Sequence, residues 1–525
     1  MSAAVWRSSP PVAVLTITGA GVPIRVATRR VVATDREGKV MQFAGALDEP
    51  TVEQRVGLDG ASGGARSVTL RCVPAVDVAE QVARAGGWGD VSGELALWSE
   101  AEPWEARTVL LRGRITPASW GPRGAALEVE LSEPAWEDVA LWPPADAVVT
   151  RRTWPDAPEA ALGVRYPWPF GLPGNFFDDD GGAASYPATP AVVVDEANLL
   201  LLVSGEAVVT ATVIIYNQTA LDSGTFSVSM VYDGLGRQVA QVDVSSKSGS
   251  GWTAADTYFV RDWGDGAIQA PDSAGALRGL GDLLLYLWRR SALRVDLAAW
   301  RALRDVLNRV EIAGYLDDPT PPADLIRDQL LPLAPDLALS PGARGVRPIW
   351  WRPLGEASAR AITVGATYAR EQTQPTRADR SGITDIEVAF GYDLAADEYR
   401  GAVGVSSQRW DGSSRGPTSH ARSAVARERR EQAQRIEARW LWSRDAAHGV
   451  ARTLSRMAWA APEQDVLSAP LWTWSLWREG DVVEVTETET AQDARRWWVS
   501  GVGLAAGRVV LSLERVEDPV GTVRR

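Results

Sequence analysis

Very few side chains in this sequence have the type and spacing that catalysis or metal binding requires. The chain holds one cysteine, Cys72, and two histidines, His420 and His448. A single thiol excludes an intramolecular disulfide and any zinc or iron–sulfur site built mainly from cysteine. Neither histidine has a second histidine three or four residues away, so both are expected at surface or helix-face positions.

Two short motifs resemble functional loops. Residues 60–64, Gly-Ala-Ser-Gly-Gly, match the G-x-S-x-G pattern of a nucleophile elbow, but they lead into a strand-like segment instead of a helix. Residues 178–182, Asp-Asp-Asp-Gly-Gly, lack the alternating oxygens and distant glutamate of an EF-hand. No phosphate-binding loop is present, and 67 acidic residues single out no carboxylate pair for glycoside hydrolysis. We therefore predict no enzyme, no catalytic residue, no cofactor and no metal.

Tryptophan is the residue type that stands out. The 24 tryptophans outnumber the 7 phenylalanines and 10 tyrosines taken together. Trp472 and Trp474 lie two residues apart, as do Trp440 and Trp442, so a strand would place each pair on one face. Exposed pairs could stack on sugars, which makes Trp472 and Trp474 candidate glycan-stacking residues. We favour burial of these rings in a core or at a subunit contact.

The composition is that of a globular protein. The 525 residues are 45% hydrophobic and 23% charged, and this length predicts about three or four domains. The formal charge of −13 argues against a surface that coats nucleic acid, although a negative wall would let enclosed DNA slide. No apolar run approaches the roughly 18 residues of a membrane helix, and we recognise no signal peptide in residues 1–16.

Shifts in the apolar pattern divide the sequence into five segments. We expect an N-terminal β domain at 1–145, a Pro/Gly-rich arm or linker at 146–190, a β module with a hairpin at 191–262, a helical block at 263–345 and a C-terminal β-rich domain with one helix at 346–525. The aromatic residues of the arm predict that it docks on another part of the protein. The fold class is mainly β with inserted helices (α+β), with several barrel- or sandwich-like modules. The sequence leaves open whether each domain is contiguous. Strands within 361–392 could complete a barrel that begins near residue 191.

Alternating and β-branched runs predict strands, and apolar residues at three- and four-residue spacing predict helices. The strands are expected at 12–18, 24–27, 67–73, 108–115, 126–131, 226–232, 239–244, 258–260, 349–352, 361–364, 383–392, 436–442, 471–476, 481–488, 495–502 and 509–513. The helices are expected at 75–84, 274–288, 297–310, 444–459 and from Pro322 to Pro332. Residues 117–124 predict a turn, and Ser443 a helix cap.

Several stretches of the second half of the chain occur in a recognisable order. They are Leu-Gly-Asp-Leu-Leu-Leu-Tyr-Leu at 280–287, Val-Asp-Leu at 295–297, Gly-Tyr-Leu-Asp at 314–317, Ile-Arg-Asp-Gln-Leu at 326–330, Ile-Thr-Asp-Ile-Glu-Val at 383–388, Ile-Glu-Ala-Arg-Trp-Leu at 436–441 and the hairpin around Gly480-Asp481. In this order, over roughly residues 255–515, the chain resembles the central tail hub or tail-tip (baseplate hub) proteins of long-tailed bacteriophages and gene-transfer agents.

The resemblance implies structural work in a virion. Proteins of this family form a homotrimer at the distal end of the tail tube, where two β modules per chain give a pseudo-sixfold ring. The expected partners are the tube, the distal tail protein and tip or fibre proteins, with DNA enclosed without sequence-specific binding. The chain would be made in the host cytoplasm and located at the tail tip of the virion, where it closes or gates the channel.

Two other functions remain open from the sequence. The first is a carbohydrate- or receptor-binding tail protein that uses Trp472 and Trp474. The second is a glycoside hydrolase, which would need a cleft with two carboxylates at a defined separation.

Overall fold

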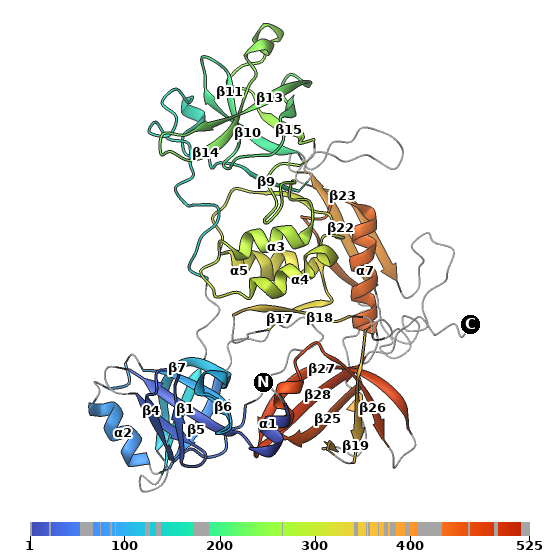
Figure 1. Ribbon diagram of the computed structural model, residues 1–525. Coiled ribbons are helices and arrows are strands. Elements are labelled where there is room, and N and C mark those ends of the chain that lie inside the picture. Colours follow the sequence, from blue (N-terminus) through green and yellow to red (C-terminus); the bar gives the residue numbers. More distant parts are fainter. Residues whose placement is uncertain are drawn as a thin grey trace. The chain divides into compact units, whose positions relative to one another are not determined.

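The chain forms two compact units in the computed structural model (Figure 1). The structure describes residues 3–19, 23–52, 67–73, 75–84, 87–89, 91–120, 126–132, 138–171, 188–264, 266–340, 345–352, 354, 357–365, 367–371, 376–377, 385–393, 398–406, 433–459, 463–487 and 492–515. The first unit combines Met1–Glu137, Asp336–Arg380 and Ala460–Arg525, and the second combines Asp138–Pro335 and Ser381–Trp459. Each unit is therefore built from stretches that are far apart in the sequence. Most elements are strands, which confirms the mainly β class.

The N-terminal module of the first unit is an eight-stranded sheet in the order β3-β4-β2-β1-β6-β7-β8-β5. Its strands are β1 (Val12–Thr18), β2 (Ile24–Ala27), β3 (Val31–Thr34), β4 (Val40–Gly45), β5 (Ser67–Cys72), β6 (Ser92–Trp98), β7 (Thr108–Trp120) and β8 (Leu127–Ser132). The strands predicted at 12–18 and 24–27 are confirmed residue for residue. The turn predicted at 117–124 is wrong in its first half, because β7 continues to Trp120. A register shift between Pro117 and Ser119 accommodates the proline, which has no N–H to donate to the ladder.

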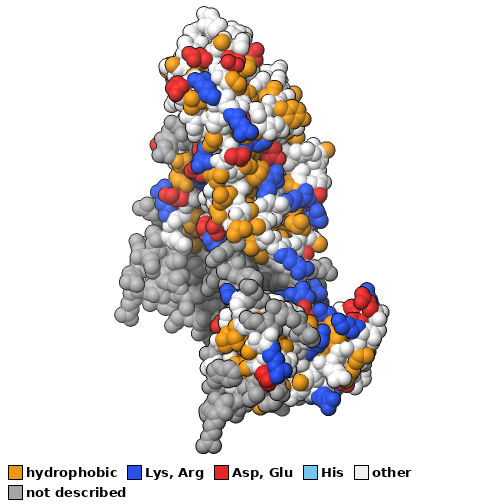
Figure 2. Space-filling model, turned by 90° about the vertical axis from the view of Figure 1, so that its left-hand side faces the viewer, with side chains coloured by type: hydrophobic (Ala, Val, Ile, Leu, Met, Phe, Trp, Pro, Cys, Tyr) orange, Lys and Arg blue, Asp and Glu red, His pale blue; other side chains and the backbone are white. Residues whose placement is uncertain are grey.

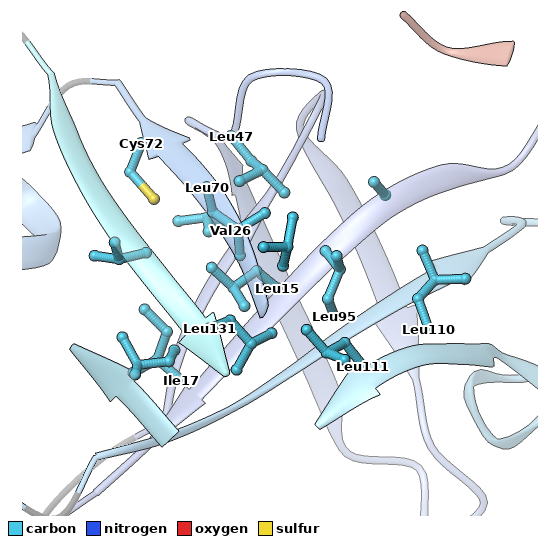
Figure 3. Close-up of a cluster of buried hydrophobic side chains, with 14 of the residues drawn as sticks. Leu15, Ile17, Val26, Leu47, Leu70, Cys72, Leu95, Leu110, Leu111 and Leu131 are labelled. Carbon is cyan, nitrogen blue, oxygen red and sulfur yellow. The ribbon is translucent and has the colours of Figure 1, made fainter. Parts of the chain in front are cut away.

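Each face of this sheet has its own apolar core, because alternate residues of a strand point to opposite faces. Figure 3 shows the larger core, where Leu15, Leu95 and Leu131 from three strands lie close together. Helix α2 (Ala75–Arg84), which has the bounds that the sequence predicts, adds Val78 and Val82 from one helix face. The smaller core on the other face consists of Val12, Val14, Ala27, Val31, Ala33, Met41, Phe43, Ala96, Trp98 and Trp104, the last from the short helix η1 (Trp104–Ala106).

The C-terminal module of the first unit is a seven-stranded sheet in the order β19-β26-β27-β28-β25-β20, with β21 also pairing with β25. The bounds are β19 (Arg360–Val364), β20 (Ala369–Arg370), β21 (Thr376–Arg377), β25 (Glu463–Pro470), β26 (Val482–Glu487), β27 (Gln492–Ala505) and β28 (Arg508–Arg515); a separate hairpin joins β17 (Leu337–Ser340) and β18 (Arg347–Trp350). Trp497, Val499 and Leu511 lie in its core. The strands predicted at 481–488, 495–502 and 509–513 correspond to β26, β27 and β28, whereas β20, β21 and β25 were not predicted.

A buried ion cluster lies in this module. The Arg370 guanidinium donates to Asp465 Oδ2 at 3.0 Å and to Glu487 Oε2 at 2.9 Å. The Asp465 side chain is fully buried, and the Arg370 side chain is 9% exposed. Burial raises the pKa of Asp465 above its ordinary value, and the opposing effect of Arg370 is smaller. When Asp465 is ionised, its charge therefore lies in a place that disfavours it, and Arg370 is the cation that offsets this cost.

The second unit contains a closed six-stranded barrel in the order β10-β11-β14-β13-β12-β15. Its strands are β10 (Thr189–Asp195), β11 (Leu200–Ser204), β12 (Thr212–Asn217), β13 (Asp222–Tyr232), β14 (Gln238–Asp243) and β15 (Tyr258–Asp262), with the short helix η4 (Ser245–Ser250) before the last. The predicted hairpin is confirmed by β13 and β14. Strands from 361–392 take no part in the barrel. The first and last strands, β10 and β15, pair directly and close it.

The helices predicted within 263–345 lie in the second unit, which includes this stretch up to Pro335, and the first of them is shorter than predicted. Helix α3 begins at Leu280, because the residues before it bond to other segments: Leu277 N–H donates to Ile268 O at 2.7 Å, and Ala276 and Gly279 form isolated bridges with Gln269 and Glu311. The elements of the block are α3 (Leu280–Trp288), α4 (Leu297–Leu307), β16 (Ala313–Leu316), α5 (Pro322–Leu325), a π-helical turn η5 (Ile326–Leu330) and a 3-10 turn η6 (Leu331–Leu333). The Asp296 side chain caps α4 by accepting from Ala299 N–H at 3.2 Å.

Helix α7 (Arg444–Trp459) lies against a three-stranded sheet in the second unit, as Figure 1 shows. The sheet has the order β23-β22-β24 and is built from β22 (Asp385–Asp393), β23 (Glu398–Ser406) and β24 (Ala433–Glu437). Helix α7 has the predicted bounds, and Ser443 Oγ accepts from Ala446 N–H at 3.1 Å as its cap. The strand predicted at 436–442 is wrong beyond Glu437, because a turn at residues 439–440 follows.

The segment predicted to be an arm docks on the helical block. Strand β9 (Trp168–Gly171), preceded by a short helix η3 (Glu159–Ala161), pairs with β16. Trp168 and Phe170 are fully buried, and the Phe170 ring lies 5.2 Å from Tyr286 of α3 in an edge-on contact. Trp168 and Phe170 therefore form part of a core, while Phe176 and Phe177 lie outside the described residues.

We expect Gly171→Ala to destabilise the second unit by at least about 2 kcal/mol. Gly171 has φ +75°, and a Cβ there would lie 1.8 Å from Ile312 O across the β9–β16 pair. Gly449→Ala in α7 is the matched control, since no atom outside the helix backbone lies within 4 Å of its Cβ position. Alanine should stabilise that helix slightly. Urea unfolding of both variants checks this, and equal stability of the two would contradict it.

We expect Arg370→Met to cost about 3–5 kcal/mol at pH 7, because it leaves the Asp465 carboxylate buried without its cation. The raised pKa of Asp465 means that the loss should shrink as the pH falls and the carboxyl group protonates. Adding Asp465→Asn should restore part of the stability. Arg71→Met, which breaks an exposed pair with Asp48, should cost less than about 1 kcal/mol. A pH-independent loss, or one no larger than that of Arg71→Met, would be the contrary result in chemical denaturation.

Candidate assembly site at the junction of two modules

The candidate residues Trp472 and Trp474 do not lie on a strand. They belong to η7 (Leu471–Leu476), a 3-10 helix that begins after Pro470, so the strand predicted at 471–476 is wrong. Thr473 Oγ1 donates to Pro470 O at 2.8 Å and stabilises the first turn. With about three residues per turn, residues two apart point in different directions instead of sharing a face.

Both rings are half-buried and pack on the N-terminal module. Trp472 and Trp474 contact the larger core of that module, although they come from the C-terminal part of the chain. The Arg7 guanidinium lies 4.4 Å from the centroid of the Trp472 ring, a cation–π contact between η7 and helix α1 (Ala3–Ser8). These contacts support the burial that we favoured for this pair.

The two modules share a core at this junction. Leu471 and Trp474 pack against the cores of both modules at once. Leu504, which is on β27 of the C-terminal module, is buried in the N-terminal core. Val52 and Leu504 also exchange two backbone hydrogen bonds, with N–H to O distances of 2.8 and 2.7 Å. Because side chains and backbone cross the boundary together, the modules form one packed body.

Helix α1 closes the same boundary. Trp6 is fully buried in the N-terminal core, and its Nε1–H donates to Glu102 Oε2 at 2.9 Å. Sequence reasoning missed this helix, since six residues are too few to show helical periodicity. The local signal is the short apolar run Ala3-Ala4-Val5-Trp6, followed by polar residues.

The other tryptophan pair also has a structural environment. Trp440 is buried in the second unit, where its Nε1–H donates to Gln329 Oε1 at 2.9 Å. Trp442 is half-buried. Neither residue lies on β24, so the two side chains do not share one face of a strand as the sequence predicted.

The residues that could do chemistry are not brought together in the described part of the chain. His448 is half-buried on α7, while His420 and the loops at 60–64 and 178–182 lie outside the described residues. Among the residues that the structure places, no three His, Cys, Asp or Glu side chains form a metal-binding group. Cys72 is buried, and burial together with Asp48 raises its pKa to about 11, so the thiol stays protonated at neutral pH.

No family model matches the sequence, and no curated protein matches it. Among solved structures, the chain is similar to the 43 kDa tail protein of prophage MuSo2 from Shewanella oneidensis, with 9% identity, a TM-score of 0.37 and 95% of each chain covered. A tail protein from Neisseria meningitidis MC58 has 7% identity and a TM-score of 0.36, with 96% of each chain covered. A native gene transfer agent virion has 14% identity and a TM-score of 0.40, with 71% of this chain and 89% of the other covered.

We expect Leu504→Ala to loosen both modules, because this side chain leaves one module and fills the core of the other. The loss should be about 2–5 kcal/mol. Hydrogen exchange should rise in β1 and β6 of the N-terminal module as well as in β27. Leu513→Ala is the matched control, since Leu513 is equally buried but packs only in the C-terminal core. If both variants raise exchange in the same strands, the junction is not a shared core.

Proposed function

We propose that this chain is a structural virion protein that forms a trimeric hub at the distal end of a phage-like tail tube. The hub would join the tube to the tip or baseplate and close or gate the DNA channel. The observation that carries the proposal is the junction, which holds two β modules of one chain in a single packed body. The sequence resemblance supplies the biological setting.

A trimer can match the sixfold symmetry of a tube only if the orientation of the two modules in each chain is constant. Three chains present six positions only if each chain offers two β modules at a constant angle. A flexible linker would have to be ordered on assembly, which costs conformational entropy at every contact. Here the Val52–Leu504 pairing and the rings of η7 set the angle in the free chain.

The proposed partners are the tail tube or distal tail protein on one side and tip or fibre proteins on the other. A closed rotational ring makes each contact between copies heterologous, and closure prevents growth into filaments. The formal charge of −13 suits a wall that encloses DNA without holding it. In the described part of the chain, no helix has the length and apolar character to cross a membrane.

Glycan binding through Trp472 and Trp474 is the alternative. The half-buried rings leave part of their surface accessible. Against this, both rings already pack on the N-terminal core, and they do not form one flat platform. We therefore place structural assembly first.

We expect the full-length protein to have a mass in solution of three times 56.6 kDa, either alone or after addition of tube or tip proteins. Light scattering at several concentrations measures this. A monomer that never assembles with any tail component would overturn the hub.

The same preparations test the alternative. Cell-wall glycans should leave the tryptophan fluorescence unchanged, and Trp472→Ala should not alter any binding that is seen. Glycan-dependent quenching that disappears in Trp472→Ala, but not in Trp350→Ala, would favour the receptor-binding function. Trp350 is also half-buried in the first unit but belongs to β18.

A further inference from the structure

A groove of about 810 Å³ lies on the outer face of the N-terminal module. It is lined by Thr16, Thr18, Arg25, Met41, Gly89, Val91, Ser92, Gly93, Glu94, Trp104, Arg107, Arg112, Gly113 and Arg114. Four of these side chains are arginines and one is an acid, in a chain whose formal charge is −13. Figure 2 shows one face of the molecule, where acidic and basic side chains are interspersed. In the lining of the groove, by contrast, arginines outnumber acidic residues.

The strand register collects these arginines in rows. One row across four strands runs Arg25, Thr16, Glu94 and Arg112, and a second runs Thr18, Ser92 and Arg114. All of these positions point away from the larger core, because their neighbours in the strands point into it. The half of this face that is not covered by the smaller core is therefore polar and cationic.

One acid orders part of the groove. Glu94 accepts from Arg107 Nε at 2.5 Å and from Arg112 Nε at 2.6 Å, one arginine on each carboxylate oxygen. The Arg107 guanidinium also lies 4.4 Å from the centroid of the Trp104 ring. Glu94 thus fixes two guanidinium groups while neutralising only one of the two charges.

Arg112, whose side chain is 49% exposed beside Glu94, and the two remaining arginines are available for an anion. Arg25 and Arg114 form no ion pair with any described residue, although Arg114 Nη2 donates to Gly89 O at 2.9 Å. The hydroxyl groups of Thr18 and Ser92 lie 2.7 Å apart in the row that ends at Arg114, so one of them donates to the other and the second can donate to a ligand. Guanidinium forks beside hydroxyl donors are suited to carboxylates and phosphates.

The shape and charge favour carboxylates on a polypeptide over nucleic acid. Arg112 and Arg114 are two apart on β7, so their side chains are roughly 7 Å apart along the strand, as are alternate side chains of an extended peptide. The one aromatic ring in the lining, Trp104, is 9% exposed and covered by Arg107, so bases have no ring to stack on. The chain's net negative charge also opposes a long polyanion more than a short acidic segment.

We propose that this groove binds a short acidic segment of a partner polypeptide, whose carboxylates pair with Arg25, Arg112 and Arg114. The partner is distinct from enclosed DNA. The inference does not depend on the trimer, because every lining residue belongs to one module of one chain.

Fluorescence anisotropy with labelled hexaglutamate, at about 50 mM salt, tests the proposal on the full-length protein. Arg25→Ser, Arg112→Ser and Arg114→Ser should each weaken binding about two- to fivefold, and the triple variant should lose it. Glu94→Gln should strengthen binding, since it releases Arg107 and Arg112. Arg29→Ser is the matched control, because Arg29 lies in the same module but outside the groove and pairs with Glu100.

Two results would overturn the proposal. One is that the wild type and the triple variant bind hexaglutamate equally tightly, or that neither binds it, while their unfolding midpoints show that both are folded. The other is a short DNA duplex that binds the groove more tightly than hexaglutamate at equal salt, with the same dependence on the three arginines. The mass measurement of the hub is independent of either result.

Discussion

The packing of two β modules around shared side chains is the constraint on which the first unit depends. Leu471 and Trp474 contact both cores, and Leu504 leaves its own sheet to fill the other. Native interiors are close-packed, so a core of this kind has one arrangement and resists gradual rotation. Opening the junction would expose apolar surface and break the Val52–Leu504 hydrogen bonds together. The relative orientation of the two modules is thus a property of the folded chain before any assembly.

Elements whose pattern is local could be predicted from the sequence. The strands at 12–18 and 24–27 and the helices α2 and α7 have the predicted bounds, because alternation, four-residue spacing and a serine cap act within a few residues. The errors occur where hydrogen bonds to backbone that is distant in the sequence determine the local conformation. Leu277 has helical spacing to Leu280 and Leu284, but its N–H donates to Ile268 O and keeps it outside the helix.

The candidate site could be predicted only in part, for the same reason. The prediction favoured burial of the paired tryptophans; Trp440 is buried, whereas Trp472 is half-buried and packs on the N-terminal core. The residue that contacts each ring could not be predicted, because Arg7 and Trp472 come from opposite ends of the chain. Nothing near Val52 in the sequence marks it as the residue that pairs with Leu504. A strand edge is completed by whatever segment the tertiary fold brings to it.

The same limit applies to charge. A net charge of −13 describes long-range repulsion, whereas a charge-selective contact depends on a few side chains within a Debye length of about 10 Å. Arg25 and Arg112 are far apart in the sequence and lie in one cross-strand row because β2, β1, β6 and β7 are neighbours in the sheet. The junction then fixes that sheet to the rest of the unit. An acidic segment held in the groove would consequently occupy a defined place relative to both modules, and in a ring it would recur once per chain.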